Sequence, residues 1–109
     1  MNNTMTHKGL TARVEFSAED GLFVGRLIGV EDVVGFHADT VDGLREAFEE
    51  AVEDYLDTCR KLGRGPLKKA SGQLMLRVPA EVHAAALRAA EAAGKSLNQW
   101  ASEVFSRAT

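Results

Sequence analysis

The feature that most constrains this chain is a short run, residues 73–79, in which apolar and polar side chains alternate. The apolar side holds Leu74, Leu76 and Val78, and the other side holds Gln73, Met75 and Arg77. A period of two is typical of a β-strand with one buried face. Pro79 ends the run, because a proline has no N–H group to donate to a β-ladder. The pattern predicts a strand with one apolar face and one polar face.

Two helices are expected after this strand. The alanine-rich stretch 80–93 predicts the first helix, and Gly94 is suited to end it. Ser96 is a good N-cap for a second helix that runs from Leu97 to about Arg107. A lone short strand is unstable, and a strand with two short helices is too small for a sufficient core. We therefore expect two copies to pair their strands into an antiparallel ribbon.

The order strand, helix, helix resembles the ribbon-helix-helix DNA-binding fold. The resemblance rests on the alternating strand, on Pro79, and on the turn Gly94-Lys95-Ser96-Leu97-Asn98. It implies that the polar side of the ribbon enters the DNA major groove and that the second helix points its N-terminus at a phosphate. The implied DNA-binding residues are Gln73, Met75, Arg77, Lys95, Ser96 and Asn98, and the implied dimer core is Leu74, Leu76, Val78, Leu97 and Trp100. The alternative is an edge strand whose exposed side carries Gln and Arg without contacting DNA.

The charge of the chain is unevenly distributed. The 109 residues have a net charge of −3. Residues 1–62 carry six Lys/Arg against thirteen Asp/Glu, and residues 63–109 carry seven against three. This asymmetry suits nucleic acid at the C-terminal part and a basic surface at the N-terminal part. A single cysteine, no signal-peptide pattern and no membrane-length apolar run lead us to expect a cytoplasmic protein without membrane contact.

The N-terminal part predicts a sheet covered by one helix. Strands are expected at 11–16, 22–30 and 33–37, with a hairpin turn at Asp20-Gly21. A long helix is expected from a cap at Asp39 or Thr40 to Leu62, with one apolar stripe facing the sheet. The predicted fold class is thus α+β, with three antiparallel strands and one long helix. The predicted domains are 1–62 and 71–109, joined by a linker at 63–70.

No enzyme is predicted. The outer face of the long helix carries Asp42, Glu46, Glu49, Glu50, Glu53, Asp54 and Asp57. Clustered carboxylates could hold a metal ion, but no other element supplies a convincing further ligand, so a solvated face is the better interpretation. His7, His37 and His83 are isolated, and Ser96 is better explained as a cap than as a nucleophile. We expect no catalytic residue, no metal site and no cofactor.

The whole order of motifs resembles the HicB family of antitoxins. The matching stretches are Val14–Phe16, Glu19–Gly21, Phe23–Leu27, Thr40–Phe48, Val52–Leu56, Gly65-Pro66, Ser71–Pro79, His83 and Lys95–Trp100. The resemblance implies a partial RNase H-like N-terminal domain that neutralises HicA, a small basic RNA-cleaving toxin. It also implies that the C-terminal unit binds double-stranded operator DNA, as a homodimer or a tetramer, and represses its own operon.

The toxin-binding residues implied by this resemblance are Glu19, Asp20, Phe23 and Arg26. The acidic face of the long helix is an equally good electrostatic match for a basic toxin, so both surfaces stay open. A different interpretation is a stand-alone ribbon-helix-helix repressor whose N-terminal domain senses a ligand or a partner. A short neighbouring reading frame that encodes a basic protein would favour the antitoxin.

Overall fold

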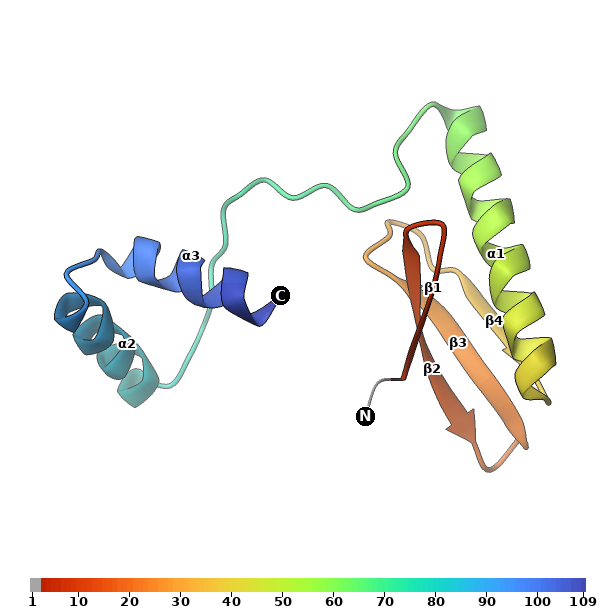
Figure 1. Cartoon of the computed structure of the whole chain (residues 1–109), viewed down its shortest axis with the longest axis horizontal. Coiled ribbons are helices and arrows are strands. Elements are labelled where there is room, and N and C mark those ends of the chain that lie inside the picture. Colours follow the sequence, from red (N-terminus) through yellow and green to blue (C-terminus); the bar gives the residue numbers. More distant parts are fainter. Residues whose placement is uncertain (1–2) are drawn as a thin grey trace. The chain divides into compact units, whose positions relative to one another are not determined.

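The computed structural model describes residues 3–109 and shows an α+β chain with two compact units. The first unit ends at Ser71 and the second begins at Gly72 (Figure 1). In the described residues the first unit contains four strands and one helix, and the second contains two helices. The predicted α+β class is confirmed.

The sheet of the first unit is antiparallel, with strand order β1-β2-β3-β4. Its strands are β1 (Thr4–His7), β2 (Leu10–Ser17), β3 (Leu22–Ile28) and β4 (Gly35–Ala38). The prediction of three strands is therefore wrong, because no strand was predicted before residue 11, where β1 lies. Lys8 and Gly9 form a two-residue turn with φ values of 50° and 79°, as a type I′ hairpin requires. This turn places β1 beside β2.

The long helix is found where it was predicted. Helix α1 (Val41–Leu62) begins after Thr40, whose hydroxyl accepts a hydrogen bond of 3.0 Å from the Gly43 N–H. It ends at Gly63, which has a left-handed φ of 67°. The helix buries Leu44, Phe48, Val52, Tyr55 and Cys59. The apolar stripe thus packs against the sheet over most of its length, while its end residues Val41 and Leu62 are exposed.

One glycine determines how closely the helix approaches the sheet. Gly25 of β3 is the cross-strand partner of Phe36 of β4. A Cβ atom at Gly25 would lie 2.2 Å from Cζ of Phe36, so the ring occupies the space above the glycine. The same ring packs on Phe48 of α1, with 5.5 Å between ring centroids. Because Gly25 has no side chain, the ring of Phe36 fits over β3 and packs on Phe48, while the strand continues through the glycine.

The first part of the expected linker packs against the N-terminal unit. Arg64 forms an ion pair with Asp32, and the Tyr55 hydroxyl donates a 2.8 Å hydrogen bond to the Pro66 carbonyl. The Lys68 N–H donates a 2.8 Å hydrogen bond to the carbonyl of Gly29. We call residues 63–68 the strap. The division into 1–62, 63–70 and 71–109 stays a prediction, but the strap lies within the first structural unit.

The C-terminal unit contains the two predicted helices. Helix α2 (Ala80–Ala92) begins after Pro79, and α3 (Leu97–Ala108) begins after Ser96. Gly94 has a φ of 70° and lies in the turn between them, consistent with its expected role in ending the first helix. The two helices pack on each other (Figure 1).

We expect Gly25→Ala to destabilise the N-terminal unit by about 1–3 kcal/mol, because overpacking displaces the Phe36 ring from the core. Chemical denaturation of the full chain measures the change. Gly35→Ala is the matched control, since a Cβ there meets only the Gly25 carbonyl oxygen, at 3.6 Å. Equal losses for the two variants would contradict the role given to Gly25.

We expect the strap to loosen at high pH. Burial, reinforced by neighbouring Cys59, raises the pKa of Tyr55 above its ordinary value of 10.0. Because the pKa of Tyr55 is higher in the folded chain than in the unfolded chain, the neutral hydroxyl adds to the free energy of unfolding below pH 10. This contribution is lost as the pH rises through the folded pKa. Tyr55 is the only tyrosine, so phenolate absorbance reports it directly. The phenolate should form at a higher pH in the folded chain than in denaturant.

The control for this pH effect is Tyr55→Phe, which removes the titrating group and the hydrogen bond to Pro66. This variant should show a weaker dependence of unfolding on pH above 10. It should also be cleaved faster by trypsin after Arg64. An unchanged cleavage rate would show that the strap is held without the tyrosine.

Candidate functional site

The segment that was expected to form a ribbon is extended and exposed. Residues 73–79 form no β-ladder in the described chain, and the structure contains one copy, which offers no partner strand. On the polar side Met75 is 92% exposed, and Gln73 and Arg77 are exposed as well. The predicted ribbon is therefore not observed, and strand pairing between two copies stays a prediction.

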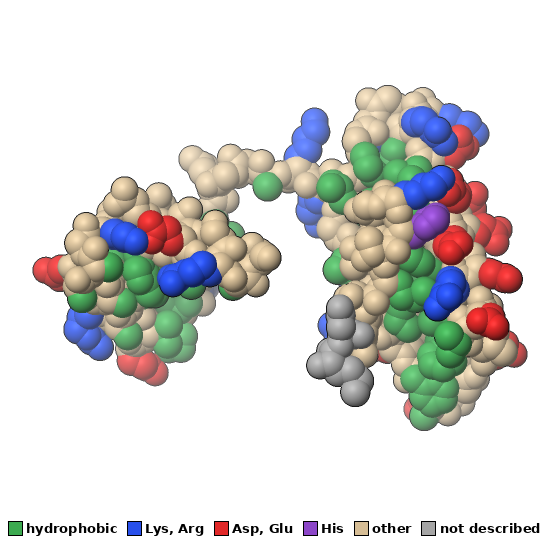
Figure 2. All heavy atoms as spheres, viewed as in Figure 1, with side chains coloured by type: hydrophobic (Ala, Val, Ile, Leu, Met, Phe, Trp, Pro, Cys, Tyr) green, Lys and Arg blue, Asp and Glu red, His purple; other side chains and the backbone are tan. Residues whose placement is uncertain are grey.

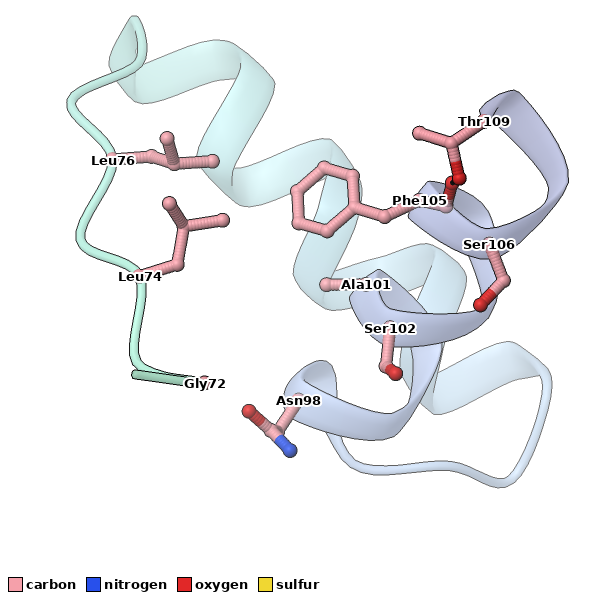
Figure 3. A pocket seen from close by; sticks show the side chains of 9 residues that line it. All are labelled: Gly72, Leu74, Leu76, Asn98, Ala101, Ser102, Phe105, Ser106 and Thr109. Atoms are coloured by element: carbon pink, nitrogen blue, oxygen red, sulfur yellow. Dashed lines mark hydrogen bonds between the residues drawn. The ribbon is translucent and has the colours of Figure 1, made fainter. Parts of the chain in front are cut away.

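The apolar side of this segment faces α3. Figure 3 shows Leu74, Leu76 and Phe105 directed toward one another across a hollow of about 500 Å³. Asn98 and Ser102 lie at its edge, on the side of α3 that faces Gly72. Leu74 is nevertheless 68% exposed and Leu76 58% exposed. The leucines are held near the helix without being covered.

A second hollow continues this apolar surface. It has a volume of about 600 Å³ and lies between the extended segment, α2 and α3, with Val78, Leu97 and Trp100 in its lining. From Gly72 onward, Ala90 is the sole buried residue in the described unit. So small a buried core is far below what an independent domain needs. The residues of the expected dimer core thus form an apolar surface that is largely uncovered in one copy.

The start of α3 is built as predicted. The Ser96 hydroxyl accepts a 3.1 Å hydrogen bond from the Gln99 N–H, and the Gln99 side-chain oxygen accepts one of 3.3 Å from the Ser96 N–H. This capping box fixes the first turn of the helix. The N–H groups of Leu97 and Asn98 belong to the turn that has no intrahelical partners. The helix start can therefore accept an anion such as a phosphate.

The expected phosphate contact of Lys95 competes with a contact inside the chain. Its ammonium forms an ion pair with Glu103 of α3. The unit from Gly72 to Thr109 carries four Lys/Arg against three Asp/Glu. Most of the basic excess of the C-terminal part comes instead from Arg64, Lys68 and Lys69. On the polar side of residues 73–79, the exposed cation is Arg77.

The four residues proposed for toxin binding do not form one site. Glu19 and Asp20 are exposed in the turn between β2 and β3. Phe23 is half-buried on the face of the sheet that α1 covers, whereas exposed Arg26 points to the opposite face, because the two are an odd number of residues apart. Arg26 lies across from Arg13 of β2. The structure thus separates Phe23 from Arg26.

Sequence reasoning missed an exposed aromatic next to the turn. Phe16 ends the predicted strand 11–16, on the same side as Ala12 and Val14, and it is 61% exposed. It packs on its cross-strand partner Phe23, with 5.3 Å between ring centroids. The alternation in β2 assigned Phe16 to the correct face. It could not show that α1 leaves this end of the face open.

The acidic face of α1 is partly neutralised by β1 and its turn. Lys8 forms an ion pair of 2.5 Å with Glu53, and His7 lies 3.4 Å from the same carboxylate. The hydrogen bond from Lys8 is the main cause that lowers the pKa of Glu53. Asp57 pairs with Lys61 at 3.0 Å. Within residues 3–109 no three His, Cys, Asp or Glu side chains are placed to hold a metal ion.

Comparison with protein families identifies one match. The model of the HicB family matches residues 55–105, from the last turns of α1 through most of α3. This match supports membership in the HicB family. No curated protein and no solved structure matched the chain. No helix of the described residues has the length and apolar character to cross a membrane.

Proposed function

We propose that the chain is an antitoxin that binds a HicA-type RNA-cleaving toxin and represses its own operon. The HicB family match carries this proposal, since the family suggests a role in a toxin–antitoxin system. The two-unit structure suits two separate tasks. The partial RNase H likeness, the ribbon-helix-helix unit and the absence of enzymatic activity are parts of the same proposal.

The C-terminal unit is proposed to bind operator DNA as a dimer. Three features support this: the exposed polar side of residues 73–77, the capped start of α3, and an apolar surface that lacks cover in one copy. In a ribbon, Arg77 would read a guanine edge, since its guanidinium fits two acceptors in the major groove. The leucines on the other side would be buried against the second copy.

The N-terminal unit is proposed to bind the toxin. Through Ser71 the chain carries nine Lys/Arg against thirteen Asp/Glu. This acidic excess suits a cationic protein and opposes nucleic acid. The unit has its own core of α1 and the sheet. It can therefore hold a binding surface in shape without help from the C-terminal unit.

We expect the two tasks to separate when the chain is divided between Ser71 and Gly72, which keeps the strap with the N-terminal unit. The fragment 1–71 should protect cells from the toxin without binding DNA. The fragment 72–109 should dimerise and bind operator DNA without protecting cells. Toxicity rescue, light scattering and gel shifts measure these outcomes. A folded fragment 1–71 that fails to bind the toxin would contradict the antitoxin role and favour a ligand-sensing repressor.

We expect Arg77→Ala to weaken specific operator binding by about 1–3 kcal/mol, because it removes a base contact. A gel-shift series with operator and random DNA measures specific and non-specific affinity separately. Arg88→Ala is the matched control, since Arg88 is an exposed arginine of α2 outside the ribbon segment. An unchanged operator affinity for Arg77→Ala would contradict the docking of the ribbon.

A further inference from the structure

An aromatic pair, with Phe16 exposed and Phe23 half-buried, lies at the end of the N-terminal sheet nearest the β2–β3 turn. Phe16 and Phe23 are cross-strand partners whose ring planes meet at 58°. Together with Met5, Val14 and Leu44 they line a hollow of about 410 Å³. We call this surface the aromatic patch. Exposed aromatic rings beside a hollow are typical of residues that dominate a protein interface.

The patch is open because of where α1 begins. The helix starts at Val41 and first buries a residue at Leu44, and its contact with Phe36 comes one turn later at Phe48. Val41 itself is 60% exposed. The helix therefore does not extend over the ring of Phe16. Figure 2 shows hydrophobic side chains at this end of the unit next to acidic ones.

The rim of the patch is mainly acidic. Glu19 and Asp20 lie in the turn that joins the two aromatic strands, and Asp42 lies in the first turn of α1. Asp20 accepts a hydrogen bond from Ser17. Glu15 also borders the hollow, but its side chain is on the opposite face of β2, where it pairs with Arg13 at 3.3 Å. Glu19 and Asp42 have no ion-pair partner within residues 3–109. Arg45 is the cation nearest to Asp42 in the sequence.

We infer that the aromatic patch is the surface on which the toxin docks, through an apolar side chain that enters the hollow and Lys or Arg side chains that pair with the acidic rim. This inference rests on the proposed function. The negative charge of the rim favours a cationic protein over two alternative occupants, a nucleic acid and a second copy of this chain. A nucleic acid would be repelled, and a second copy would bring two acidic rims together.

The test is binding of the full chain to the purified, catalytically inactive protein encoded by the neighbouring reading frame. Phe16→Gln should weaken binding about 30-fold or more, as expected for a central aromatic of an interface. The denaturation midpoint should stay close to that of the parent, since Phe16 is mainly exposed. Val24→Gln is the matched control, because Val24 is 44% exposed on the opposite face of β3 and should bind like the parent.

A charge variant tests the rim independently. Glu19→Lys should slow association at low salt, and the difference from the parent should shrink as salt screens the charges. The same reversal at Glu50, on the outer face of α1, should have a smaller effect on association. A larger effect at Glu50 would place the toxin on the acidic helix face instead and overturn the inference.

The outcomes distinguish the inference from the proposed function. If the parent chain does not bind the toxin, the proposed function fails, and the aromatic patch loses this occupant with it. If the parent binds and Phe16→Gln binds equally well, only the inference is overturned. A change in oligomeric state caused by Phe16→Gln, measured by light scattering without toxin, would show that a second copy covers the patch. That result would also overturn the inference.

Discussion

The packing of α1 on the sheet is the interaction on which the N-terminal unit depends. Phe48 and Val52 are almost completely buried, and the Phe36 ring fits between Phe48 and the backbone of Gly25. Because Gly25 has no side chain, an aromatic ring can lie over β3 without moving the helix away. The same helix supplies Tyr55, whose hydroxyl anchors the strap at Pro66. The core, the sheet and the strap therefore depend on the position of one helix.

The C-terminal unit lacks an equivalent of this helix-on-sheet layer. Its two helices bury Ala90, and its extended segment leaves both leucines and Val78 largely uncovered. Apolar surface of this kind is stabilised by burial at about 25 cal/mol per Å², and in one copy most of that stabilisation is missing. A partner chain would supply the cover and the missing β-ladder at once. If two copies pair as proposed, folding and association of this unit would be a single event.

The sequence predicted best those features that arise from neighbouring residues. The stripe of α1, the caps at Thr40 and Ser96, and the glycine ends at Gly63 and Gly94 all depend on contacts within about four residues. Strand β1 was missed because its short polar segment becomes a strand only beside β2. The strap was missed because its hydrogen bonds join Lys68 to Gly29 and Tyr55 to Pro66. The exposure of Phe16 depends on where a helix begins in space, which alternation along β2 does not encode.

The strap changes how the two proposed tasks can influence each other. Lys68 is bonded to Gly29, and the connector from Lys68 to Gln73 spans five residue steps, which reach about 17 Å when fully extended. A short connector therefore joins the N-terminal unit, which carries thirteen carboxylates, to the segment proposed to enter DNA. If the C-terminal unit binds DNA as proposed, repulsion between these carboxylates and the phosphates would oppose binding, and a cationic toxin on the N-terminal unit would reduce that repulsion. Because coupling between two binding sites is reciprocal, operator DNA would in turn strengthen the binding of the toxin.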